Sequence, residues 1–146
     1  MFSSTIFADI PHVIQLAVAP VFLLTAICTL LMVLTNRLGR SVDRRRVLAS
    51  HLQDAQADLA SLARDELSEV ERRIRMIYGA ITLAVLAAIF VCVLIAVAFM
   101  DALITADLAS VVAAMFVLAM LALIGALATF LREIFVAVNS ARSTIR

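Results

Sequence analysis

Long apolar stretches alternate with charged segments along the chain. Three stretches carry no charged residue: Val13–Leu34, Met76–Met100 and Leu108–Leu131. As α-helices they would measure roughly 33, 37 and 36 Å, and crossing a hydrocarbon core of about 30 Å takes about 20 apolar residues. Because lipid offers no partner for an unpaired backbone group, each span has to be helical. We predict an all-α, polytopic membrane protein of one domain (1–146), with spans at about 10–36, 76–100 and 107–131.

The segment between the first two stretches, about 37–75, is charged in three blocks that are basic, acidic and basic in turn. Apolar residues recur along it at helical spacing, in two series: Leu48, Leu52, Ala55, Leu59, Leu62, and then Ala63, Leu67, Val70, Ile74, Ile77. Both ends of the segment attach to the membrane, so we expect a cytoplasmic helical hairpin with its turn within 53–65. Two points stay open: whether the arms pair within or between chains, and whether a helix restarts near Ser68 or runs on into the second span.

The basic residues are distributed unevenly between the two sides of the predicted membrane. Nine of the twelve lie in 37–75 and the other three follow the last stretch. Arginine-rich segments stay on the cytoplasmic side, so we expect the N-terminus outside and the hairpin and C-terminus inside. The use of arginine without lysine suggests a GC-rich bacterial genome, and therefore a bacterial inner membrane.

The composition narrows the range of functions. Hydrophobic residues make up 64% of the chain and charged residues 16%, whereas globular chains have roughly 45–50% and about 25%. With 3 Gly, 2 Cys and 2 His, there is little material for a phosphate loop, a thiolate metal site or a nucleophile–histidine pair. We therefore expect no enzyme, no cofactor and no metal site. A net charge of +1 argues against nucleic-acid binding.

Polar residues of the first span fall on one side of the predicted helix, within a sector of roughly 140° at 100° per residue. They are His12, Gln15, Thr25, Thr29, Asn36 and Arg40. Inside a bilayer such a polar stripe rarely faces lipid. It either packs against other helices or lines a water-filled pore, and the sequence leaves both interpretations open.

Small residues are spaced four apart in the second and third spans, which is typical of closely packed membrane helices. The candidates are Ala80, Ala84, Ala88, Cys92 and Ala96 in the second span, and Gly125 and Thr129 in the third. Three spans make a thin monomer, so we expect a homo-oligomer. The depths of Cys28 and Cys92 differ by roughly 12 Å, too far for a disulfide, and both are interpreted as packing residues.

Charged residues flank the spans on both sides. Three carboxylates lie near the expected outer ends, where an oligomer would bring them together as an acidic ring: Asp9, Asp101 and Asp107. Alternatively their role is local, since Asp9 and Asp107 fall at predicted helix N-termini, where the macrodipole favours an anion. Six arginines are candidates to contact anionic lipid headgroups: Arg44, Arg45, Arg46, Arg72, Arg73 and Arg75. Arg73 and Arg75 also follow Glu69 and Glu71 by four residues, which suits ion pairs along one helix.

Three groups of residues carry a resemblance to a known family. They are Ile14-Gln15-Leu16-Ala17 running into Ala19-Pro20-Val21-Phe22-Leu23-Leu24-Thr25, then Leu34-Thr35-Asn36-Arg37-Leu38 with Val42-Asp43-Arg44, and finally Arg75, Ile77 and Ala80-Ile81. Together they resemble a bacterial membrane family known as domain of unknown function 2721, from Ile10 to about Leu131. The resemblance implies three spans and carries over no activity, cofactor or catalytic residue.

Two functions fit these features. The first is a non-enzymatic structural or accessory subunit, with the anionic lipid bilayer, further copies of the chain and a larger membrane complex as partners. The second is an oligomeric ion pore lined by the first span, with Asp9 at its outer mouth and Asn36, Arg40 and Arg44 at its inner mouth. No Asp, Glu, His, Lys or Arg lies within the three apolar stretches, which counts against proton-coupled transport.

Overall fold

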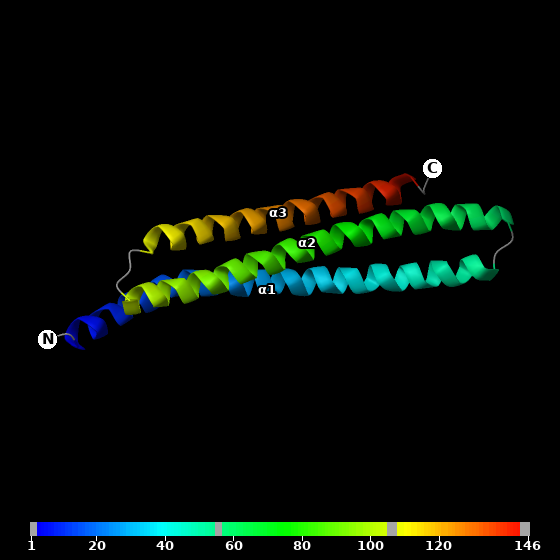
Figure 1. The fold of residues 1–146 in the computed structure, drawn as a ribbon. Helices are drawn as coiled ribbons and strands as arrows, with labels where there is room; N and C mark the ends of the chain where they lie inside the picture. The colour runs from blue at the N-terminus through cyan, green and yellow to red at the C-terminus, as the bar shows by residue number, and fades with distance from the viewer. Residues whose placement is uncertain (1–2, 55–56, 105–107, 144–146) are drawn as a thin grey trace. The chain divides into compact units, whose positions relative to one another are not determined.

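The protein consists of three long helices in a computed structural model that describes residues 3–54, 57–104 and 108–143 (Figure 1). The helices are α1 (Ser3–Asp54), α2 (Ala57–Ile104) and α3 (Ala109–Ser143). Side chains at 3–14, 16–17, 51–54, 57–63, 65, 102, 104 and 139–143 lie outside this description. The all-α architecture predicted from the apolar stretches is confirmed.

Each helix contains a stretch long and apolar enough to cross a membrane. These stretches are Val18–Ser50, Glu66–Asp101 and Ala109–Val138. Their lengths exceed the roughly 20 residues that a hydrocarbon core requires, because each continues past the uncharged segment into flanking charged residues. The chain is therefore a membrane protein with three transmembrane helices.

The two arms of the hairpin are continuous with the first two spans. α1 runs from the first span to Asp54 without interruption, and α2 runs from Ala57 through Ser68 into the second span. Of the two alternatives for Ser68, the uninterrupted helix is the one found. No Gly or Pro lies between Arg40 and Tyr78 to break these helices. The predicted turn interval 53–65 contains the end of α1 and the start of α2, and residues 55–56 between them lie outside the description.

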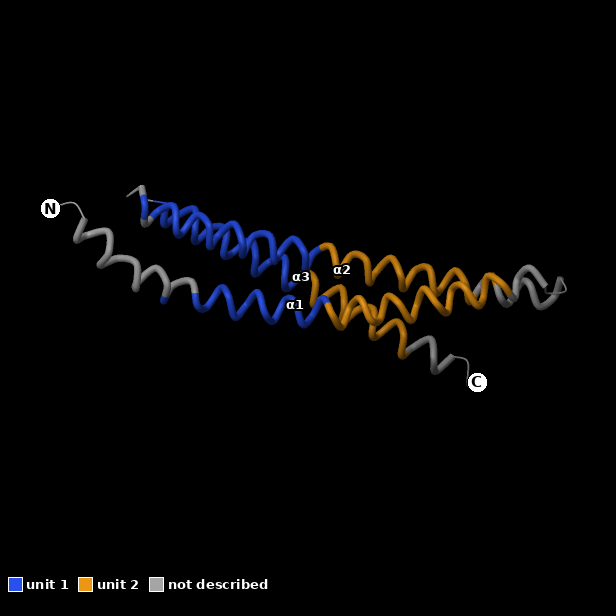
Figure 2. Tube along the Cα trace, turned by 90° about the horizontal axis from the view of Figure 1, so that it is seen from below, with its two compact units in different colours: residues 1–31, 83–124 blue, residues 32–82, 125–146 orange. Residues whose placement is uncertain are grey.

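The chain divides into two compact units, each built from parts of all three helices (Figure 2). Unit 1 comprises Met1–Leu31 and Leu83–Ile124, and unit 2 comprises Met32–Thr82 and Gly125–Arg146. The buried apolar residues of unit 1 are Pro20, Ile27, Ala84, Ala87, Val91, Leu94 and Ala119. Those of unit 2 are Leu34, Leu48, Val70, Ile77, Ala80 and Ala126. Of the two predicted hairpin series, Leu48, Val70 and Ile77 are thus buried.

Within unit 1, the buried face of α2 differs from the predicted ladder of small residues. Its buried positions alternate three and four residues apart, from Ala84 and Ala87 to Val91 and Leu94. Cys92 and Ala96 are exposed and Ala88 is half-buried. Four residues turn a helix through about 400°, so a strict four-residue ladder drifts about 40° per step around the helix. The predicted ladder therefore does not form one packing face within the chain.

Within unit 2, α2 and α3 approach closely at a glycine that the sequence patterns did not single out. A Cβ built on Gly79 would lie 3.8 Å from Cγ2 of Thr129. The Thr129 hydroxyl donates a hydrogen bond of 2.8 Å to the Gly125 carbonyl one turn earlier in α3, which turns its methyl group toward α2. Small residues thus allow this approach, as in other membrane helix pairs.

Candidate functional site

Glu133 of α3 is the one buried charged side chain among the residues that the structure describes, with 1% of its surface exposed. It lies in unit 2, two residues beyond the uncharged stretch of the third span. A buried carboxylate is costly unless it is paired with positive charge and hydrogen-bonded. Sequence analysis did not single out Glu133.

Two arginines from the other two helices neutralise the Glu133 carboxylate. Arg73 of α2 donates a hydrogen bond from Nη2 to Oε1 at 3.5 Å. Arg37 of α1 places Nη2 3.2 Å from Oε2, but this approach lacks hydrogen-bond geometry, so Oε2 has an ionic partner and no hydrogen bond. The Glu133 cluster, defined as Arg37, Arg73 and Glu133, joins all three helices of unit 2.

An aromatic ring holds one of these arginines in place. The guanidinium of Arg37 lies 5.3 Å from the centroid of the Phe130 ring. Such a cation–π contact is worth about 0.5–2 kcal/mol, depending on desolvation. Phe130 and Glu133 are one turn apart on α3. A single turn of α3 therefore contacts the Arg37 guanidinium twice, through the carboxylate of Glu133 and through the ring of Phe130.

The positions of the three cluster residues relative to the apolar stretches explain why they meet. Arg37 follows the first stretch, Arg73 precedes the second and Glu133 follows the third. Since successive spans run in opposite directions, these are the same end of each span. The feature of the sequence that could have identified Glu133 is its position as an acidic residue at the end of a span where the arginines are concentrated.

Two further ion pairs connect the hairpin arms within the chain. Arg44 of α1 pairs with Glu66 of α2, and Arg45 pairs with Glu71 at 3.2 Å. All four side chains are about half exposed. The arms therefore pair inside one chain, which the sequence left open.

The ion pairs predicted along one helix are replaced by pairs between helices. Arg73 contacts Glu133 of α3 rather than Glu69, and Glu71 contacts Arg45 of α1 rather than Arg75. An exposed pair along one helix is worth only a few tenths of a kcal/mol. A partner on a neighbouring helix therefore competes easily with it.

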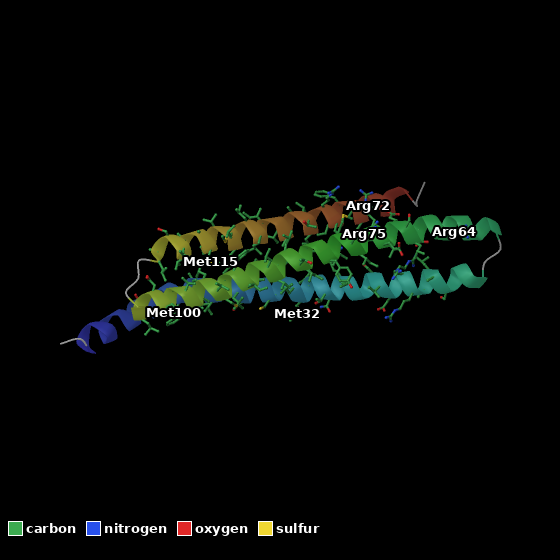
Figure 3. All side chains as sticks on the ribbon, in the orientation of Figure 1. Met32, Arg64, Arg72, Arg75, Met100 and Met115 are labelled. Atoms are coloured by element: carbon green, nitrogen blue, oxygen red, sulfur yellow. The ribbon has the colours of Figure 1, made fainter. Side chains whose placement is uncertain are left out.

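Three of the six arginines predicted to meet lipid headgroups, namely Arg44, Arg45 and Arg73, are engaged in these ion pairs. The other three are exposed: Arg46 on α1, and Arg72 and Arg75 on α2 (Figure 3). Engagement with a carboxylate does not prevent a half-exposed arginine from meeting a lipid phosphate as well. Headgroup contact stays a prediction for all six.

The described members of the polar stripe are exposed in the single chain. They are Gln15, Thr25, Thr29, Asn36 and Arg40, and the side chain of His12 lies outside the description. The Thr25 hydroxyl donates to the Val21 carbonyl at 3.2 Å and the Thr29 hydroxyl to the Thr25 carbonyl at 3.0 Å. Both threonines are thus satisfied by their own helix.

Three members of the stripe, Thr25, Thr29 and Asn36, lie opposite the buried face of α1 in their units. At 100° per residue, Thr25 and Thr29 are within about 20° of the direction opposite Ile27 in unit 1, and Asn36 is equally close to the direction opposite Leu34 in unit 2. Exposed apolar side chains share this side of α1, including Phe22 and Met32. The face is therefore mixed rather than continuously polar.

Of the three outer carboxylates, only the side chain of Asp101 falls within the description, which omits those of Asp9 and Asp107. Asp101 accepts a hydrogen bond of 3.0 Å from the backbone N–H of Leu108. The Leu108 carbonyl in turn accepts from the N–H groups of Val111 and Val112. Asp101 therefore links the end of α2 to the residue before α3 within unit 1, a contact that the sequence did not predict.

The described part of the chain contains no cluster of three or more His, Cys, Asp or Glu side chains that could hold a metal ion. Cys28 and Cys92 are free thiols and exposed. Because both are exposed, neither packs within the single chain, and packing of either cysteine against another chain stays a prediction.

Comparison with known proteins gives one match. A family model described as "Protein of unknown function (DUF2721)" matches residues 17–143. The chain matches none of the curated proteins and none of the solved structures with which it was compared. The family match agrees with the resemblance of the sequence motifs, and its description states no activity.

Proposed function

The chain belongs to this family of proteins of unknown function, and we propose that it is a non-enzymatic subunit of a membrane assembly made from further copies of itself. The exposed face of α1 that carries Thr25, Thr29 and Asn36 is the proposed contact surface. A bacterial inner membrane, with the hairpin and C-terminus in the cytoplasm, is the proposed location. This location rests on the distribution of arginine.

The observation that carries the proposal is the position of these polar residues on the side of α1 turned away from the chain's own core. The buried residues Ile27 and Leu34 already serve the contacts within the chain, so the opposite face is available to a neighbour. Polar residues in membrane helices rarely face acyl chains. A second copy supplies polar and small residues with which they can pack.

The extent of burial agrees with this proposal. Within the chain, only 17%, 22% and 17% of the most apolar segment of the first, second and third span, respectively, is buried. Much of this surface suits acyl chains, but the exposed Cys92 and Ala96 of α2 leave room for another backbone to approach. These small residues offer a second surface for the same assembly.

The composition of the α1 face favours helix packing over a pore. A hydrated channel needs a polar wall, whereas Phe22 and Met32, 72% and 65% exposed, stand beside the threonines. The hydroxyls of Thr25 and Thr29 are also bound to their own helix. An ion pore lined by the first span is therefore the second candidate, and the mixed face argues against it.

Site-directed crosslinking tests the proposed contact. In a background with Cys28→Ala and Cys92→Ala, we expect Thr25→Cys to form disulfide-linked dimers in native membranes on mild oxidation. The matched control is Ala26→Cys, which is also exposed and lies at the same depth, but is turned about 100° away around the helix. We expect the Ala26→Cys protein to crosslink at least tenfold less.

Two further measurements complete this test. The mass of the wild-type protein in lipid nanodiscs should correspond to more than one chain. A single-chain mass, together with equal crosslinking at residues 25 and 26, would contradict the proposal. Ion flux through wild-type protein in liposomes above the empty-liposome background, reduced in Thr29→Leu, would replace it with the pore.

A further inference from the structure

A cavity of about 260 Å³ lies beside the Glu133 cluster, entirely within unit 2. It is bordered on α1 by Arg37, Arg40, Ser41 and Arg44, and on α2 by Val70 and Arg73. Sites for drug-sized ligands measure about 300–1,000 Å³. The cavity is therefore suited to a small polar group rather than to a large organic molecule.

The charge of the lining selects for an anion. Four of the six lining residues are arginines, and the described lining contains no carboxylate. Two acidic residues outside the lining, Glu133 and Glu66, pair with three of these arginines. The four lining arginines and these two carboxylates together carry a net charge of +2. Arg40 is exposed and contributes a guanidinium that no described carboxylate binds.

The hydrogen-bond donors around the cavity are not all used by the protein. Nε of Arg73 is buried and donates to no acceptor among the described residues, and buried donors in folded proteins nearly always have a partner. The Ser41 hydroxyl adds another donor to the same wall. Planar guanidinium groups bind phosphate oxygens in pairs, so this donor set matches a phosphate.

The position of the cavity indicates where such a phosphate would come from. Arg37 lies just after the first apolar stretch, and Arg73 lies just before the second. The cavity therefore lies where hydrocarbon gives way to the polar headgroup layer. Basic pockets between membrane helices at this level bind anionic headgroups.

From these observations we infer that the cavity bordered by Arg37, Arg40, Ser41, Arg44 and Arg73 is a binding site for the phosphate group of an anionic phospholipid. The arginines surround the phosphate, Ser41 donates to it, and the buried Val70 forms the apolar wall. This site is more specific than attraction of a basic segment to a charged surface, because the donors converge on one cavity. It does not depend on the assembly proposed above.

Thermal unfolding of the full-length protein in a neutral detergent tests this inference. A ligand that binds only the folded state raises the unfolding temperature. We expect phosphatidylglycerol to raise it by several degrees, and phosphatidylcholine and inorganic phosphate to have no comparable effect. A response to inorganic phosphate alone would assign the cavity to a soluble phosphate and overturn the lipid assignment.

Two variants with the same change in charge separate the cavity from the surface. Arg40→Gln removes a lining guanidinium that is outside the described ion pairs, and Arg132→Gln removes an exposed guanidinium of α3 that does not line the cavity. We expect Arg40→Gln to weaken phosphatidylglycerol binding about tenfold, in line with the loss of hydrogen bonds to a charged group. Arg132→Gln should change it less than twofold.

The same measurements can overturn the inference. Equal weakening in Arg40→Gln and Arg132→Gln would show that lipid is attracted by overall charge and not by the cavity. Equal stabilisation by phosphatidylglycerol and phosphatidylcholine would show that the headgroup is not recognised. Ser41→Ala provides a second variant that keeps every charge, and we expect it to weaken binding severalfold.

Discussion

A single carboxylate connects the three helices of unit 2. Glu133 is 1% exposed, and its arginine partners are 26% and 30% exposed, so the cluster is shielded on its acidic side only. Pairs of this kind contribute little net stability when intact, because the desolvation of the charges offsets their attraction. Removing one partner is different, since it leaves uncompensated charge.

We predict that Glu133→Ala destabilises the protein by about 3 kcal/mol, the lower end of the range for breaking a buried pair. The reason is that Arg37 and Arg73 would face each other without a counter-charge. Denaturant unfolding in mixed micelles measures the change. The matched control is Glu66→Ala. Glu66 is 46% exposed and pairs with Arg44, and losing such an exposed pair should lower the free energy of unfolding by no more than about 1 kcal/mol.

Equal losses in Glu133→Ala and Glu66→Ala would contradict the structural importance of the Glu133 cluster. Glu133→Gln separates charge from shape. It keeps the length of the side chain, but its neutral amide cannot compensate the two guanidiniums. We therefore expect Glu133→Gln to be nearly as destabilising as Glu133→Ala.

At the scale of single elements, α2 shows how a packing face is read from a sequence. Small residues recur four apart in the second span, but the buried positions in unit 1 alternate three and four residues apart. This alternation averages 3.5 residues, close to the 3.6 of an α-helix. It therefore keeps side chains on one face over several turns, which a strict four-residue spacing does not.

Two alanine substitutions distinguish the face observed in the structure from the predicted ladder. Ala87 is fully buried in unit 1 but lies off the ladder, whereas Ala96 belongs to the ladder and is exposed. We predict that Ala87→Leu destabilises the monomer by about 1–3 kcal/mol through overpacking. Ala96→Leu should stay within about 0.5 kcal/mol, as is usual for surface substitutions.

Unfolding in a detergent that keeps the protein monomeric measures both effects. A larger loss for Ala96→Leu than for Ala87→Leu would show that the ladder, and not the alternating positions, packs within the chain. The same two variants in lipid nanodiscs report on assembly. There, Ala96→Leu should alter the oligomeric mass if the exposed small residues contact a neighbour.

At the scale of the whole molecule, the charge distribution predicts which side of the membrane each connection occupies. Cysteine labelling in intact cells tests this orientation in the background with Cys28→Ala and Cys92→Ala. We predict that Leu103→Cys, at an exposed position near the end of α2, reacts with a membrane-impermeant maleimide added from outside. Arg64→Cys, near the start of α2 in the hairpin, should react only after permeabilisation (Figure 3).

Arg64→Cys removes one of nine hairpin arginines, so the positive charge that sets the orientation is largely kept. Labelling of Arg64→Cys in intact cells, with Leu103→Cys protected, would reverse the assignment of inside and outside. The lipid site would then belong to the opposite leaflet, although its residues would be unchanged.

The sequence by itself determined that the chain is helical and crosses the membrane three times. These properties follow from one-dimensional features: the length of each apolar stretch, the need to satisfy backbone groups in lipid, and the lack of helix-breaking residues between Arg40 and Tyr78. Each can be judged without knowing what lies beside the helix.

Only the tertiary structure decided which charged residues meet and which helix faces are buried. Arg73 had a suitable partner in Glu69 on its own helix, yet it contacts Glu133, sixty positions away. That choice depends on how each helix is rotated about its axis, where one residue changes the direction of a side chain by about 100°. The rotation is fixed by packing between helices, and a pattern along one helix does not contain it.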